Sequence, residues 1–159
     1  MTTTTLSPRT VAPGGGETVR VITDLITTKA LAADTGGAYS LFETVTQPGQ
    51  GSPPHFQRRE EETFYILAGT YTFLLGERTI ELAAGGYAFA PRGTVHAFTN
   101  TGDTPARMLI LVTPGGIHEN FFAELGESPD APPPAGGPDV GRIVAVGAKY
   151  DVEILPPPA

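Results

Sequence analysis

The chain has 159 residues, a formal net charge of −7 and a sequence pI near 4.8. This length predicts one domain that buries its own core, and the acidic balance excludes a nucleic-acid partner, because nucleic acids select a basic surface. No apolar run approaches the ~20 residues of a membrane span, residues 1–10 lack the apolar centre of a secretory signal, and the absence of cysteine excludes disulfides. We therefore expect a cytoplasmic protein with no membrane partner.

The 20 glycines and 16 prolines predict an all-β chain of short strands joined by tight turns. Three parts are expected: a flexible N-terminal segment over residues 1–16, a β-domain over 17–127, and a Pro/Gly-rich extension over 128–159. The extension contains one candidate helix, at 138–149, which Gly141 and Gly147 weaken.

The predicted elements follow in chain order. The β-branched run Val19 to Ile26 predicts the first strand, and Asp34 to Gly37 predicts a turn before a second strand at 39–45. Glycines separate further strands, predicted at 63–67, 71–75, 79–82, 87–90, 97–100 and 107–113. A short helix is predicted at 117–125. Strands at this spacing are typical of a sandwich or a closed barrel.

Two motifs lie among these strands. The first has the pattern G-x5-H-x-Q-x4-E-x6-G, with the residues Gly49, His55, Gln57, Glu62 and Gly69. The second has the pattern G-x5-P-x-G-x2-H-x3-N, with the residues Gly85, Pro91, Gly93, His96 and Asn100. The glycines are expected to supply turns with positive φ, and Asn100 to tie a turn by side-chain hydrogen bonds.

The positions of the polar residues in these motifs bring possible metal donors to one interior. His55 and Gln57 are two residues apart in a strand, so both face the interior. Glu62 shares a face with Phe64, whereas Glu61 would point outward, which favours Glu62 as the ligand. His96 comes from a distant strand. Imidazole and carboxylate donors suit Fe, Mn, Ni, Cu or Zn and do not choose among them.

The role of Gln57 stays open between a weak oxygen ligand and a hydrogen-bond donor to water or substrate near the metal. The third alternative is that the chain has lost the metal and kept the barrel. His118 lies outside both motifs and is expected to face solvent. The turn Arg58, Arg59 and Glu60 is expected to be solvated, although an arginine at the barrel mouth could meet an anionic substrate.

The two motifs resemble those of the cupin superfamily, G-x5-H-x-H-x(3,4)-E-x6-G and G-x5-P-x-G-x2-H-x3-N. The second matches at every position, and the first departs only where Gln57 replaces the second histidine. The stretch from Pro53 to Phe122 resembles small single-domain bacterial cupins described as quercetin 2,3-dioxygenase-like. The resemblance implies a cupin barrel (a double-stranded β-helix or jelly roll), a homodimer and a metal held by His55, Glu62 and His96, with Gln57 in place of the missing histidine.

Three functions remain for such a barrel, because the fold does not fix the reaction. The first is a metal-dependent dioxygenase acting on an aromatic or enolisable small molecule, with Glu62 as base as well as ligand. The second is a metal-dependent isomerase, cyclase or lyase, in which the metal only polarises a carbonyl. The third is a small-molecule binder without catalysis.

Overall fold

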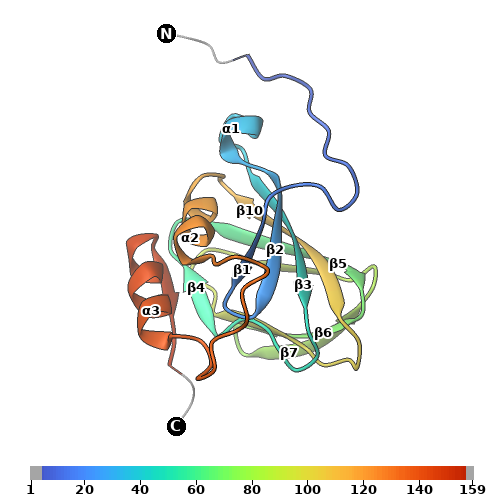
Figure 1. Cartoon of the computed structure of the whole chain (residues 1–159), viewed down its shortest axis with the longest axis vertical. Helices are drawn as coiled ribbons and strands as arrows, with labels where there is room; N and C mark the ends of the chain where they lie inside the picture. Colours follow the sequence, from blue (N-terminus) through green and yellow to red (C-terminus); the bar gives the residue numbers. More distant parts are fainter. Residues whose placement is uncertain (1–4, 157–159) are drawn as a thin grey trace.

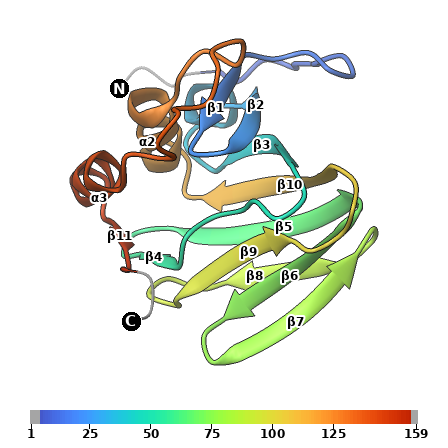
Figure 2. The same cartoon turned by 60° about the horizontal axis from the view of Figure 1, so that its bottom comes forward.

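Two antiparallel sheets face each other in a jelly-roll arrangement in the computed structural model, which describes residues 5–156. In this part of the chain the larger sheet has six strands, in the order β1 (Thr18–Val21), β2 (Asp24–Ala30), β3 (Ser40–Thr46), β10 (Ala106–Thr113), β5 (Glu61–Ala68) and β8 (Tyr87–Ala90). The five-stranded sheet has the order β11 (Val152–Ile154), β4 (His55–Gln57), β9 (His96–Asn100), β6 (Thr70–Leu75) and β7 (Arg78–Ala83). Figure 2 shows the two layers from the side, with β10 and β5 above β9 and β6.

Alternating burial along the strands builds the core between the sheets. In β3 every second residue is buried, and the same alternation follows β10. Large aromatic rings from the two sheets meet at the centre, where the centroids of Phe64 and Phe73 lie 5.2 Å apart. Phe98 of β9 packs edge-on against Tyr71 of β6 at 5.7 Å. The predicted all-β fold is therefore confirmed.

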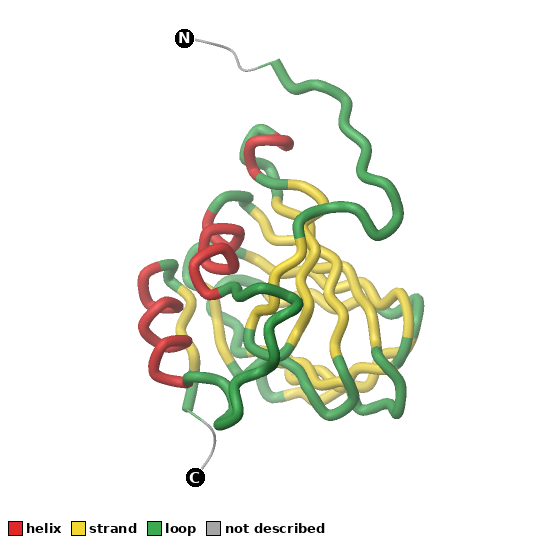
Figure 3. Tube along the Cα trace, in the orientation of Figure 1, coloured by secondary structure: helices red, strands yellow, loops and turns green. Residues whose placement is uncertain are grey.

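The helices gather at one side of the sheets. Besides the single turn α1 (Ala32–Thr35), they are α2 (Ile117–Leu125) and α3 (Val140–Lys149). Figures 1 and 3 show α2 and α3 side by side next to β4. Helix α2 matches the predicted helix, and its Phe122 packs edge-on against Phe42 of β3 at 5.0 Å. None of the helices within residues 5–156 is long and apolar enough to cross a membrane.

The N-terminal strand prediction was wrong in its extent. The run predicted as one strand folds instead as the hairpin β1–β2, with Val21 opposite Asp24 across a two-residue turn. Ile22 in this turn has φ 59°, a conformation that β-branched residues rarely adopt. The preference of Ile22 for an extended conformation is overridden, because the turn lets both β1 and β2 bury side chains against the core.

The chain after residue 127 joins the smaller sheet. β11 pairs with β4, with Val152 opposite Gln57 and Ile154 opposite His55. The Leu155 N–H also donates to the Pro54 carbonyl at 2.9 Å. At the other end, residues 5–16 form neither helix nor strand, and residues 1–4 of the predicted flexible segment lie outside the described residues. β11 therefore borders the strand that carries His55 and Gln57.

Candidate metal centre

Three strands bring the candidate ligands together between the sheets. His55 and Gln57 are the two buried residues of β4, and His96 begins β9 directly opposite His55. Glu62 belongs to the other sheet and is buried on β5, whereas the Glu61 side chain is 38% exposed. The pleat therefore turns Glu62 inward and Glu61 outward, as the sequence predicts.

The turn before β9 aims His96. Gly93 has φ 75°, and its N–H donates to the Gln57 carbonyl at 2.8 Å, which fixes the turn against β4. The Thr94 N–H donates to the Pro91 carbonyl at 3.0 Å. The predicted structural roles are confirmed here, and also at Asn100, whose amide donates to the carbonyls of Thr46 and Thr104.

Backbone carbonyls hold the two imidazoles in one tautomer. His55 Nδ1 donates to the Pro53 carbonyl at 2.9 Å, and His96 Nδ1 donates to the Thr94 carbonyl at 2.8 Å. A carbonyl oxygen only accepts, so Nδ1 of each ring carries a proton and Nε2 is the nitrogen that faces the interior. A histidine oriented in this way can bind a metal through Nε2 once that nitrogen is unprotonated.

Both Nε2 atoms face one carboxylate oxygen. Oε2 of Glu62 lies 2.7 Å from His96 Nε2 and 3.7 Å from His55 Nε2, and one potential ligand atom from each residue lies within 4.8 Å of the others. Because a carboxylate only accepts, the 2.7 Å contact is a hydrogen bond from His96 Nε2, and a bound metal would take the place of its proton. The donor types and their spacing fit a divalent transition metal.

Burial and hydrogen bonding shift the pKa values of this group in opposite directions. Burial by itself raises the pKa of Glu62, but the bonds to His55 and His96 outweigh it and hold the pKa well below its ordinary value. For His55, burial lowers the pKa, and the bond to Glu62 only partly opposes it. An ionised carboxylate beside a neutral imidazole is the protonation state that metal binding requires.

Gln57 is a hydrogen-bond donor in this arrangement. Its side chain is fully buried, and Nε2 donates to Glu62 Oε2 at 2.8 Å. The bond fixes the carboxylate that faces the two imidazoles. This geometry favours the second of the two roles left open for Gln57, a partner of the site, over direct ligation by its oxygen.

The expectation that Glu60 and His118 face solvent was wrong. Only 1% of Glu60 and 2% of His118 is exposed. The Glu60 carboxylate accepts from the His118 backbone N–H at 2.7 Å and from His118 Nδ1 at 3.2 Å. Gly116 offers no capping side chain, and Glu60 satisfies the free His118 N–H in the first turn of α2. Burial lowers the pKa of His118, but the bond to Glu60 and the charge of Glu62 outweigh it, so the pKa is raised.

The sequence held a signal for this burial. His118 precedes Phe121, Phe122 and Leu125 by three, four and seven residues, which is the spacing of one apolar helix face. Once a helix is predicted at 117–125, this periodicity predicts that His118 is buried on the same face as the two phenylalanines and the leucine.

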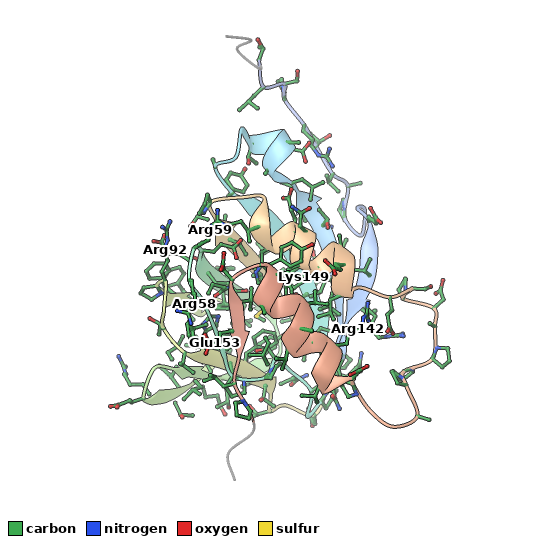
Figure 4. All side chains as sticks on the ribbon, turned by 90° about the vertical axis from the view of Figure 1, so that its left-hand side faces the viewer. Arg58, Arg59, Arg92, Arg142, Lys149 and Glu153 are labelled. Atoms are coloured by element: carbon green, nitrogen blue, oxygen red, sulfur yellow. The ribbon has the colours of Figure 1, made fainter. Side chains whose placement is uncertain are left out.

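The turn arginines are exposed, as the sequence predicts, and they engage the C-terminal segment. Arg58 pairs with Glu153 of β11, and Arg59 Nη1 lies 3.3 Å from Asp151 Oδ2. Arg92 Nε lies 3.4 Å from Glu61 Oε1. Figure 4 shows the labelled Arg58 beside Glu153, next to α3. These arginines are paired on the outside of the sheet and do not line the pocket described next.

A pocket leads from the candidate metal centre toward the helices. Its walls are mostly apolar and come from both sheets, the β1–β2 hairpin, α2 and β11. The polar side chains that line it are Asp24, Ser52, His55, Glu62 and His118. An apolar cleft with a few convergent polar groups is the usual form of a small-molecule site.

Comparison with known proteins identifies the family. The Cupin domain family matches residues 42–112, which include all four candidate site residues. This chain belongs to the cupin superfamily. The match agrees with the two motifs and with the double-sheet fold.

Two curated relatives of this cupin differ in length. It is 31% identical to Protein SchB of Streptomyces halstedii over 108 residues, which are 67% of this chain and 78% of the relative. It is 26% identical to quercetin 2,3-dioxygenase of Bacillus subtilis over 120 residues, which are 76% of this chain. The matched part is only 35% of that dioxygenase, so this cupin spans about a third of its length.

Solved structures share the fold. The polyketide cyclase RemF of Streptomyces resistomycificus superposes with a TM-score of 0.59 at 25% identity, covering 67% of this chain and 79% of the cyclase. KdgF of a Halomonas species superposes with a TM-score of 0.62 at 15% identity, covering 69% of this chain and 96% of KdgF. The second likeness supports the fold alone.

Proposed function

We propose that this cupin is a metal-dependent dioxygenase that acts on an aromatic or enolisable small molecule in the pocket between its sheets. The observation that carries the proposal is the convergence of two imidazole nitrogens and one carboxylate oxygen within 4.8 Å at one end of a largely apolar pocket. Two histidines and one carboxylate are the donor set of non-haem iron oxygenases, which leaves positions open for substrate and dioxygen.

His55, Glu62 and His96 would hold the metal. When bound, the metal supplies a Lewis acid that polarises a substrate oxygen. Pro53 and Thr94 keep the two Nε2 atoms directed inward through hydrogen bonds from Nδ1 to their carbonyls. Gln57 contributes through its bond to Glu62, which holds the carboxylate in place.

The residues of the pocket would bind and orient the substrate. Phe98, Ile110 and Phe122 offer flat and branched apolar surfaces on which an aromatic ring packs while water is excluded. Glu62 is the carboxylate beside the imidazoles, so we assign it a second role as acceptor of a proton from a substrate hydroxyl. The similarity to quercetin 2,3-dioxygenase supports an oxygenated aromatic compound as the substrate class.

A second candidate reaction is a cyclisation, isomerisation or lyase reaction that consumes no oxygen. The 25% identity to the polyketide cyclase RemF at a TM-score of 0.59 favours it. The same centre would then only polarise a carbonyl, and the same pocket would hold an enolisable chain. A binder without catalysis remains the outcome if no metal is retained.

Oxygen uptake tests the proposal. Metal-loaded wild type is mixed with quercetin and with a panel of hydroxylated aromatic ketones, and dissolved oxygen and products are followed together. We expect oxygen consumption in step with substrate loss. Glu62→Gln should abolish it, whereas Glu61→Gln, which changes the outward-facing neighbour, should retain it. Substrate loss without oxygen uptake would assign the second reaction, and no conversion by the metal-loaded protein would refute both.

A further inference from the structure

Asp24 is a buried carboxyl in the candidate substrate pocket that neither motif contains. It begins β2, immediately after the two-residue turn of the hairpin, and only 5% of it is exposed. It lines the same pocket as His55 and Glu62, and it enters from the opposite sheet to His55. An aspartate at a hairpin turn ordinarily faces solvent, so its inward position calls for an explanation.

The Asp24 carboxyl is incompletely satisfied. Within residues 5–156, its Oδ1 is one of three buried side-chain oxygen or nitrogen atoms without a hydrogen-bond partner. A buried carboxyl oxygen without a partner costs free energy, and such atoms are rare in native structures unless a ligand or a reaction uses them. Oδ1 is enclosed by protein atoms, so an ionised Asp24 would lack both water and a hydrogen-bond donor at this oxygen, which favours the protonated carboxyl.

The surroundings of Asp24 favour its neutral form. Burial raises the pKa of Asp24 to about 7, and a hydrogen bond with Thr46 opposes this shift. Thr46 also accepts a hydrogen bond from the Tyr71 hydroxyl at 3.2 Å, so these neighbours are neutral groups. The other titratable groups that face the pocket are His55, Glu62 and His118. No cationic lysine or arginine lines the pocket to hold Asp24 ionised.

We propose that Asp24 is the proton donor of this pocket, a neutral carboxylic acid that hydrogen-bonds an oxygen of the bound substrate and transfers its proton to it. The inference rests on the proposed function, because it needs an oxygen-bearing substrate between the two sheets. In the step, the O–H bond of the Asp24 carboxyl breaks and an O–H bond forms on the substrate oxygen. The carboxylate that remains recovers its proton from water after product leaves.

A proton donor of this kind gives the pocket two carboxyl groups with different tasks. Glu62 lies among hydrogen-bond donors beside the two imidazoles, whereas Asp24 lies among apolar and hydroxyl groups. Carboxyl pairs in contrasting surroundings recur where one group acts as acid and the other stays ionised. The geometry therefore assigns the acid to the hairpin and the ionised group to the candidate metal centre.

The first measurement is a carbon NMR titration of the metal-loaded protein with labelled aspartate side chains. The Asp24 signal is identified by its absence from Asp24→Asn, and Asp103→Asn, at an exposed loop position, serves as the control. We expect the Asp24 signal to titrate with a midpoint near 7. A midpoint below about 5, the range of ordinary aspartates, would overturn the inference.

The second measurement is the pH profile of turnover with whichever compound of the oxygenase panel the wild type converts. Asp24→Asn should keep its metal and lose about 10²- to 10⁴-fold in kcat, together with the limb of the profile near pH 7, while Asp103→Asn should match wild type. An Asp24→Asn protein with wild-type kcat and an unchanged profile would refute the proton-donor role and leave the proposed function standing. A wild type that converts nothing would refute the proposed function, and the titration midpoint would then decide the state of Asp24.

Discussion

At the scale of single residues, the carbonyls of Pro53 and Thr94 determine what the two histidines can do. Each accepts a hydrogen bond from Nδ1, at 2.9 and 2.8 Å, so each ring turns its Nε2 toward Glu62. The motif spacing predicts that these rings face inward, but it does not predict the tautomer, because the accepting carbonyls belong to positions that any residue type could fill. Backbone carbonyls therefore orient the two candidate histidine ligands.

The role of Gln57 leads to a prediction on metal affinity. Its amide donates to Glu62 Oε2 at 2.8 Å, so Gln57→Ala should weaken metal binding by about 10- to 100-fold without abolishing it. Gln57→His should tighten the binding of Ni, Cu or Zn, because imidazole is the better ligand for these ions. Metal titrations of both variants beside His96→Ala make the comparison. If Gln57→Ala loses metal as completely as His96→Ala, then Gln57 is itself a ligand.

Asp24 leads to a prediction on the pH dependence of stability. The pKa of Asp24 is about 7 in the folded chain and 3.8 for an ordinary aspartate, so between these pH values Asp24 is protonated in the folded state and ionised in the unfolded state. This difference stabilises the folded state fully below about pH 4, and the stabilisation is lost as the pH rises through 7. An asparagine does not titrate, so Asp24→Asn lacks this pH-dependent loss. The free energy of unfolding of Asp24→Asn relative to wild type should therefore rise between pH 4 and 8, by on the order of 4 kcal/mol.

Urea unfolding at pH 4, 6 and 8 measures this difference, and the titrations of His55, Glu62, His118 and Tyr71 are common to both proteins. A difference between wild type and Asp24→Asn that stays constant with pH would show that Asp24 keeps an ordinary pKa.

At the scale of elements, the start of α2 depends on the carboxylate of Glu60, the residue just before β5. Glu60 accepts from the His118 N–H and from its ring, and both residues are buried. Removing one partner of a buried polar pair leaves the other unsatisfied, so Glu60→Ala should lower the free energy of unfolding by about 3 kcal/mol. Glu61→Ala removes only a partly exposed pair with Arg92 and should cost less than about 1 kcal/mol. Equal losses in urea unfolding of the two variants would contradict the capping role.

The elements also show where sequence patterns succeed. The short helix predicted at 117–125, after Pro114, Gly115 and Gly116, has the bounds that the structure shows. The hairpin at 18–30 was missed because Ile22 adopts a positive φ that its side chain disfavours, so no local signal marks the turn. β11 is three residues long and is held by pairing with β4, a contact that connects positions nearly a hundred residues apart. Short strands of this kind depend on their partner rather than on propensity.

At the scale of the whole molecule, the two motifs predict the double-sheet fold, because their glycines and prolines mark the turns and their alternating residues mark the inner faces of the strands. They could not predict the pocket, whose far wall comes from the hairpin, α2 and β11, all outside the motifs. Asp24 and His118 belong to this wall. Each became a site candidate only when the fold placed it in the pocket that Glu62 also lines, since neither has a spacing to the motif residues that points to the pocket.

The assembly leads to a prediction on mass. The edge strands of the six-stranded sheet are β1 and β8. The free edge of β1 is partly covered, because Arg20 and Glu127 exchange two backbone hydrogen bonds of 2.9 Å. On β8, Tyr87 is 61% exposed and Phe89 42% exposed. Exposed apolar patches at an edge strand favour association, so we expect a homodimer that Tyr87→Lys weakens. Light scattering at micromolar concentration should give twice the mass of 16.6 kDa, and a monomer mass for wild type would contradict it.

The central claim is that His55, Glu62 and His96 hold one divalent transition metal. Metal analysis by mass spectrometry of freshly purified protein tests it most directly, with wild type, His96→Ala, Glu62→Gln and the neighbouring control Glu61→Gln prepared in parallel. We predict about one metal per chain in wild type and in Glu61→Gln, and none in His96→Ala or Glu62→Gln, because the first removes one of three donors and the second replaces the only anionic donor by a weak amide oxygen. A metal-free wild type that stays metal-free after titration with Fe, Mn, Ni, Cu and Zn, or a Glu62→Gln protein that keeps its metal, would contradict the account.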